Sequence, residues 1–209
     1  LETYFQVYFG DVPNEIPVDF NSGDVVNHTY ANTGTYDVKV VALNGGTQTI
    51  EVAKAVIISN PLLLPIDFQS STLNYAFTDF GGATSTVINN PDVSTGNGSS
   101  KVAQFYKNAG SEVWAGSFLT LGAPIDFSTM QTIKMKVWSP KAGIVVKMKL
   151  ENLTNADINL EVDATTTIAN GWEELSYNFA AANNDKTYQK VVVFFDFGVA
   201  GTGVNYYFD

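Results

Sequence analysis

The chain has 209 residues, of which 45% are hydrophobic, and its 21 acidic and 11 basic residues give a formal net charge of −10. This length and hydrophobic content are sufficient for two domains with separate cores. No arginine occurs, so the bidentate contacts that favour phosphate are absent, which argues against nucleic acid as a partner. No cysteine occurs, which excludes disulfides and thiol catalysis, and no apolar run approaches the roughly 20 residues of a membrane span.

The first strand-like segments lie near the N-terminus, at Val7–Asp11 and His28–Val40. In the second, a Gly34 turn leads into Tyr36–Val41, where apolar and polar side chains alternate. A period of two is that of a half-buried strand. The same alternation returns in Thr49–Ile58, so this region is predicted to be entirely β-structure.

The motifs in these strands resemble the signature of polycystic-kidney-disease (PKD) type immunoglobulin-like modules. That signature is a Phe-Gly-Asp strand, then His-Thr-Tyr and a Gly-Thr-Tyr strand, matched here by Phe9-Gly10-Asp11, His28-Thr29-Tyr30 and Gly34-Thr35-Tyr36. The resemblance implies an immunoglobulin-like spacer over residues 1–59, with the single histidine in a structural turn. Because such modules normally have more sequence before the Phe-Gly-Asp strand, we expect this one to be N-terminally incomplete and cropped from a longer precursor.

The turn cluster Ser59-Asn60-Pro61, reinforced by Pro65, indicates a domain boundary, so a second domain is expected over residues 62–209. This region consists of short apolar segments separated by turns such as Gly81-Gly82 and Asn170-Gly171. Strands at this spacing are typical of a sandwich or jelly roll. The whole chain is therefore predicted to be all-β: an immunoglobulin-like β-sandwich of the PKD type followed by a β-jelly-roll sandwich.

The two ends of the second domain resemble those of jelly-roll carbohydrate-binding modules that accompany bacterial polysaccharidases. Such modules open on Asp-Phe-Glu and close on Tyr-Tyr-Phe-Asp, as do Asp67-Phe68-Gln69, with Gln69 in place of Glu, and Tyr206 to Asp209. A PKD-type spacer joined to such a module resembles the surface glycan-binding proteins of polysaccharide-degrading Gram-negative bacteria. The resemblance implies an extracellular or outer-membrane location, a monomer, and a place in an outer-membrane glycan-uptake complex.

Strand alternation gives candidate ligand-binding residues independently of the resemblance. In Ile133–Trp138 and Val145–Glu151 the apolar side chains define a core face, so the lysines point to the other face. In Val191–Phe197, Phe195 and Phe197 are expected in the core and Asp196 on the outer face, where a carboxylate between two phenylalanines requires a lysine or hydroxyl partner. If these strands share one sheet, they present Trp114, Trp138, Phe194, Lys136, Lys149, Glu151 and Asp196.

An aromatic plane beside charged groups is what a sugar requires, because a pyranose has an apolar C–H patch and hydroxyls that need donors and acceptors. We therefore predict non-catalytic binding of a polysaccharide, with a neutral β-glucan such as laminarin as the leading ligand. An anionic, alginate-like chain is the alternative, because four lysines are predicted to face outward: Lys134, Lys136, Lys147 and Lys149. A structural or adhesive protein without glycan binding is another, favoured if Trp114 and Trp138 are buried.

A glycanase is the last alternative, since a glycosidase needs only two carboxylates, here Glu151 and Asp196. Their lysine-rich surroundings favour ionised carboxylates, whereas a general acid needs a raised pKa, so no catalysis is expected. A structural calcium ion is predicted separately. Calcium takes six to eight oxygen ligands, and four residues supply them if the ends of the domain pair: Asp67, Gln69, Asn97 and Asp209.

Overall fold

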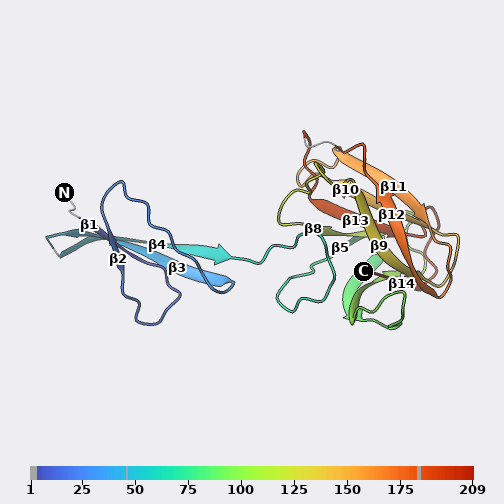
Figure 1. Cartoon of the computed structure of the whole chain (residues 1–209), viewed down its shortest axis with the longest axis horizontal. Coiled ribbons are helices and arrows are strands. Elements are labelled where there is room, and N and C mark those ends of the chain that lie inside the picture. The colour runs from blue at the N-terminus through green and yellow to red at the C-terminus, as the bar shows by residue number, and fades with distance from the viewer. Residues whose placement is uncertain (1–3, 46, 183–184) are drawn as a thin grey trace. The chain divides into compact units, whose positions relative to one another are not determined.

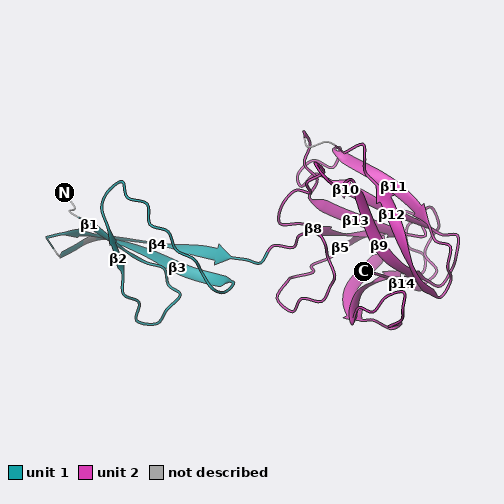
Figure 2. Ribbon diagram, viewed as in Figure 1, with its two compact units in different colours: residues 1–60 teal, residues 61–209 magenta. Residues whose placement is uncertain are grey.

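The computed structural model describes residues 4–45, 47–182 and 185–209, and the chain divides into two compact units, residues 1–60 and 61–209 (Figure 2). Every regular element in the described residues is a β-strand, which confirms the predicted all-β class. Within this part of the chain no helix has the length and hydropathy needed to cross a membrane.

Unit 1 is built on one antiparallel sheet with the strand order β2-β1-β3-β4 (Figure 1). The strands are β1 (Tyr4–Tyr8), β2 (Val18–Phe20), β3 (Gly34–Asn44) and β4 (Thr47–Ile58). The long hairpin of β3 and β4 contains the segments whose alternation predicted strands. Of the two sheets expected for an immunoglobulin-like sandwich, the described residues of unit 1 form this one.

The signature residues of unit 1 pack against one another at the ends of β1 and β3. The His28 ring stacks on Phe9 with 4.0 Å between centroids and meets the edge of Tyr30 at 4.6 Å. Tyr30 stacks in turn on Tyr36 at 4.2 Å. His28 Nε2 lies 2.8 Å from an Asp11 carboxylate oxygen. The histidine therefore has the structural role that the sequence predicts.

Unit 2 is a sandwich of two five-stranded antiparallel sheets, as predicted for a jelly roll (Figure 1). The front sheet has the order β11 (Asn159–Thr165), β10 (Val145–Glu151), β13 (Lys190–Phe195), β8 (Gly116–Thr120) and β5 (Thr78–Phe80). The back sheet has the order β12 (Gly171–Asn178), β9 (Thr132–Ser139), β14 (Val204–Phe208), β7 (Lys101–Lys107) and β6 (Ala83–Asn89).

The core of unit 2 lies between these sheets and is rich in aromatic rings. Phe195 of the front sheet stacks on Tyr206 of the back sheet at 5.0 Å, and both side chains are almost fully buried. Phe68 meets the edge of Phe208 at 5.6 Å. This contact brings the opening and closing segments of the unit together, as the resemblance to jelly-roll modules implies.

Candidate glycan-binding face

The outer face of the front sheet carries most of the candidate ligand-binding residues. In β10, Val146 and Leu150 are fully buried, so Lys147 and Lys149 project from the opposite side of the sheet. The register of β10 with β13 pairs Lys147 with Phe194 and Lys149 with Val192. Directly paired residues project from the same face of a sheet. The predicted outward direction of Lys149, Glu151 and Phe194 is therefore confirmed.

An aromatic cluster, made of Phe80, Trp114 and Phe194, lies at one end of this face. Trp114 is 48% exposed and stacks on Phe80 with 6.1 Å between ring centroids and 18° between planes. Phe194 meets the edge of Phe80 at 5.7 Å. Gly116 forms the floor, because a Cβ there would lie 2.6 Å from Phe80 Cζ and 2.8 Å from Phe194 Cδ1. Only glycine leaves room for both rings, and together they support the exposed indole.

An ion-pair network of two lysines and three carboxylates covers the neighbouring part of the face. Lys149 Nζ lies 2.9 Å from Glu151 and 3.6 Å from Glu161. Lys147 Nζ lies 3.0 Å from Glu161 and 2.9 Å from Asp163. Burial of Lys147 favours its neutral form, but its hydrogen bonds to Asp163 and Glu161 outweigh this and raise the pKa of the ammonium group. The network therefore holds charged donors and acceptors in fixed positions.

Sequence reasoning missed several residues of this face. Pairing in the sheet aligns Lys147 with Asp163 and Lys149 with Glu161, and the Lys190 ammonium lies 5.4 Å from the centre of the Phe118 ring. Alternation within β5, β8 and β11 could have indicated their outward direction. What the sequence lacked was the order of the strands, which decides which neighbours lie beside β10. The missed residues are Phe80, Phe118, Glu161, Asp163, Lys190 and Phe197.

Asp196 corrects the sequence prediction, because its side chain leaves the outer face. It has φ = 50°, in the left-handed region, so the strand alternation ends at Phe195. Its carboxylate is nearly buried, 3.4 Å from the Tyr206 hydroxyl and 3.6 Å from Lys141 Nζ. The predicted lysine partner therefore exists, but on the inner side. Phe197, predicted in the core, lies instead beside Phe194 at 5.4 Å.

Trp138 and Lys136 also correct the prediction, because β9 belongs to the back sheet. Both project away from the core, as predicted, but from the opposite side of the sandwich. The Trp138 indole N–H donates to an Asp92 carboxylate oxygen at 3.1 Å, and the ring meets Tyr207 edge-on at 5.3 Å. Lys136 Nζ lies 3.4 Å from Asn97 Oδ1. The single face expected from alternation is therefore divided between two faces, since period-two patterns do not tell one sheet from the other.

The proposed glycanase pair is not assembled. Glu151 is at one end of β10, whereas Asp196 lies beside Val145 at the other end, because Phe197 N–H donates to the Val145 carbonyl. Six residues of extended strand span roughly 20 Å. Catalytic carboxylates of glycosidases lie about 5–9.5 Å apart. Glu151 and Asp196 therefore cannot act as the two carboxylates of one glycosidase site.

The four predicted calcium ligands do not surround one point. Within the described residues no three acidic, histidine or cysteine side chains gather at a potential metal site. Asn97 Oδ1 accepts from Ser99 N–H, whereas Gln69 Nε2 donates to the carbonyl oxygens of Asp67 and Lys101. Asp209 Oδ1 is buried without a hydrogen-bond partner in the described structure. A cation that recruited this oxygen, the Gln69 amide oxygen and the two carbonyls would satisfy it, so calcium stays a prediction without Asn97.

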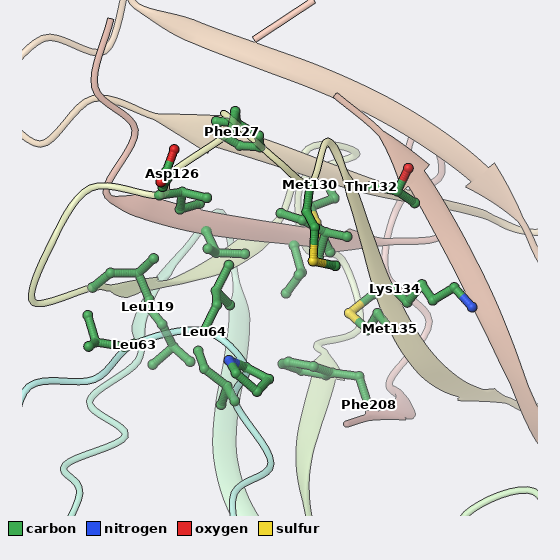
Figure 3. Close-up of a pocket in the computed structure, with 18 of the residues that line it drawn as sticks. Leu63, Leu64, Leu119, Asp126, Phe127, Met130, Thr132, Lys134, Met135 and Phe208 are labelled. Atoms are coloured by element: carbon green, nitrogen blue, oxygen red, sulfur yellow. The ribbon is translucent and has the colours of Figure 1, made fainter. Parts of the chain in front are cut away.

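A cavity of about 740 Å³ opens between the two sheets, beside the segment that begins unit 2 (Figure 3). The Lys134 ammonium at its rim is paired with Glu174 at 2.7 Å. Such a lining offers few donors or acceptors to hydroxyl groups, so we do not place a sugar there. Its apolar walls include Leu63, Leu64, Leu119, Phe127, Met130, Met135, Met148 and Phe208.

The fold of the chain is similar to those of solved carbohydrate-binding modules. A module of the β-sandwich superfamily, studied for its promiscuous specificity, aligns with 16% identity and a TM-score of 0.50 over 100% of this chain and 83% of that one. An exo-β-agarase aligns with 8% identity and a TM-score of 0.53 over 72% of this chain, which spans 24% of that enzyme. A family 11 module from a Clostridium thermocellum cellulase aligns with 12% identity and a TM-score of 0.47, covering 73% and 92% of the two chains.

These similarities show a β-sandwich fold of the kind found in carbohydrate-binding modules. No protein-family model matches the sequence, and no curated protein matches it significantly.

Proposed function

We propose that unit 2 binds a neutral polysaccharide without catalysis, through the outer face of its front sheet. The observation that carries this proposal is the exposed Trp114 ring, supported from below by Phe80 and Gly116 beside the ion-pair network. The indole face offers an apolar plane to the C–H groups of a pyranose. The paired lysines and carboxylates offer its hydroxyls charge-assisted hydrogen bonds, and their mutual pairing holds them in place.

The charges of this face favour a neutral chain over an anionic one. Lys147 and Lys149 are bonded to carboxylates, and the three lysines of the face are balanced by three acids. The other two lysines that suggested an alginate-like ligand, Lys134 and Lys136, belong to the back sheet. An anionic polymer on the front face would have to compete with carboxylates already in place. We therefore retain a β-glucan such as laminarin as the proposed ligand.

The proposal includes the setting in which the glycan is bound. A PKD-type spacer in unit 1, supported by the packing of the Phe9-Gly10-Asp11 and His28-Thr29-Tyr30 motifs, would present unit 2 at the outer-membrane surface or outside the cell. A monomer in an outer-membrane glycan-uptake complex, or an accessory region of a secreted glycanase, would both use such an arrangement.

A calorimetric titration of the whole chain against a panel of polysaccharides tests this function. The panel should contain laminarin, a β-1,4-glucan, agarose oligosaccharides and alginate. We expect saturable binding of a neutral glycan that is lost in Trp114→Ala. Failure to bind any member of the panel, or binding that does not depend on Trp114, would reject the proposed site.

A further inference from the structure

Lys107 is a charged side chain inside the sandwich. It ends β7 of the back sheet, is 2% exposed, and reaches across the core to the front sheet. Its Nζ donates to the carbonyl oxygens of Phe195 and Asp196, at 2.9 Å each. Burial lowers the pKa of this ammonium, and the negative charge of Asp196 opposes that effect. A buried lysine is costly and rare, so the two carbonyl contacts must supply a compensating benefit.

The two carbonyls belong to the turn that ends β13. Asp196 has φ = 50°, which costs a residue with a Cβ about 1–2 kcal/mol. Val199 N–H donates to the Asp196 carbonyl at 3.1 Å, which closes the turn. Lys107 thus bonds two consecutive carbonyl oxygens that an extended strand would point in opposite directions. The ammonium therefore stabilises the left-handed conformation against continued strand.

The turn decides what lies on the proposed glycan-binding face. Because alternation ends at Asp196, Phe197 lies on the outer side, edge-on to Phe194 at 5.4 Å. The Lys147 ammonium lies 4.6 Å from the centre of the Phe197 ring, while it also bonds Glu161 and Asp163. Phe197 therefore connects the aromatic cluster to the ion-pair network.

We propose that Lys107 is a positioning residue for the glycan-binding face: its ammonium holds the left-handed Asp196 turn, which places Phe197 and, through it, Lys147. This inference rests on the proposed function, because Lys107 itself is buried beneath the face. It explains why a cation is retained in the core at this position. It also explains why the face includes a phenylalanine that strand alternation assigns to the interior.

The test separates positioning from general stability by making the turn independent of Lys107. Glycine adopts positive φ without the steric cost of a Cβ, so Asp196→Gly favours the turn by itself. Lys107→Met should lower the melting temperature and weaken laminarin binding roughly tenfold. In Lys107→Met/Asp196→Gly, binding should return to within about threefold of the Asp196→Gly parent, while the melting temperature stays low because the Tyr206 and Lys141 contacts of Asp196 are also lost.

A second readout does not depend on glycan binding. The Phe197 ring should shift the Lys147 methylene proton resonances upfield in the NMR spectrum of the parent chain. Lys107→Met should abolish this shift, and the double variant should restore it. If Lys107→Met does not fold, Lys107→Gln, which keeps one donor, replaces it throughout.

The outcomes are distinguishable. A ring-current pattern that follows this prediction while no glycan binds would reject the proposed function and leave the positioning role. Binding and ring-current shifts that are unchanged in Lys107→Met would overturn the positioning role. So would affinities that follow the melting temperature in every variant, since that is the behaviour of a residue with only a structural role.

Discussion

The two outer faces of unit 2 are built from similar residues and differ in how available those residues are. The front face carries Trp114 with Lys147 and Lys149, and the back face carries Trp138 with Lys136. Trp114 is 48% exposed on a support of other rings, whereas the Trp138 indole N–H is bonded to Asp92 and its ring contacts Tyr207. Residue type and strand alternation therefore do not identify a binding face. The support beneath the aromatic ring does.

Trp114→Ala is the strongest test of this difference. Removing the exposed indole should weaken glycan binding roughly ten- to a hundredfold, or about 1–3 kcal/mol, by analogy with aromatic hot spots. The fold should be retained, because half of the ring is already in solvent. Titration calorimetry measures the affinity, and thermal unfolding confirms the fold. Trp138→Ala is the matched control on the back face and should bind glycan within about twofold of the parent, although loss of its Asp92 contact should lower the melting temperature.

Equal losses in the two variants would show that binding involves both faces. Full affinity in Trp114→Ala would move the site away from the front face altogether.

Gly116→Val addresses the support rather than the ring that contacts sugar. A Cβ at this position would lie 2.6 Å from Phe80 and 2.8 Å from Phe194, so both rings must move. We expect roughly tenfold weaker binding together with a lower melting temperature, since overpacking costs about 1–3 kcal/mol. Gly98→Ala is the control, because a Cβ there meets nothing within 4 Å. Unchanged affinity in a folded Gly116→Val protein would show that the support of Trp114 does not matter.

Much of this architecture is predictable from the sequence, for a physical reason. Period-two alternation gives the direction of each side chain relative to its own strand, so Lys149, Glu151 and Phe194 are correctly predicted to face outward. It does not say which sheet a strand joins, because that depends on long-range pairing in a jelly roll. Trp138 and Lys136 were assigned to the wrong face for this reason.

The Asp196 turn shows a different limit. Its left-handed backbone is held by Lys107, which is 89 residues away in sequence. Within β13 the apolar run continues through Phe197 as though the strand did, and only Gly198 indicates a turn. A local pattern therefore assigned Phe197 to the core and Asp196 to the surface, and both assignments are reversed by one distant contact.

Calcium sharpens the comparison from the other side, because the predicted ligands lie away from the front face. An ion that binds only the folded state at about 100 times its Kd stabilises by roughly 2.7 kcal/mol. For a domain of this size that is a rise in melting temperature of about 5–10 °C. Unfolding in excess calcium and in chelator measures it, with Asp209→Asn as the variant in which the rise should shrink. Identical unfolding curves would remove the calcium prediction, and a change in glycan affinity would place the ion near the wrong face.

The smallest expected effect is that of salt on glycan binding, and it separates the two glycan classes. A neutral β-glucan releases no counterions, and the lysines of the front face already have carboxylate partners at 2.9–3.0 Å. The Debye length falls from about 10 Å at 0.1 M to about 3 Å at 1 M, which screens exposed charges but leaves short hydrogen bonds nearly unaffected. Laminarin affinity should therefore change by less than about twofold over this range. An alginate-like ligand held by lysines would instead bind more weakly at every increase in salt. A steep salt dependence abolished by Lys134→Met/Lys136→Met would assign recognition to the back face, because those two lysines are separated from the front-face network by the whole thickness of the sandwich.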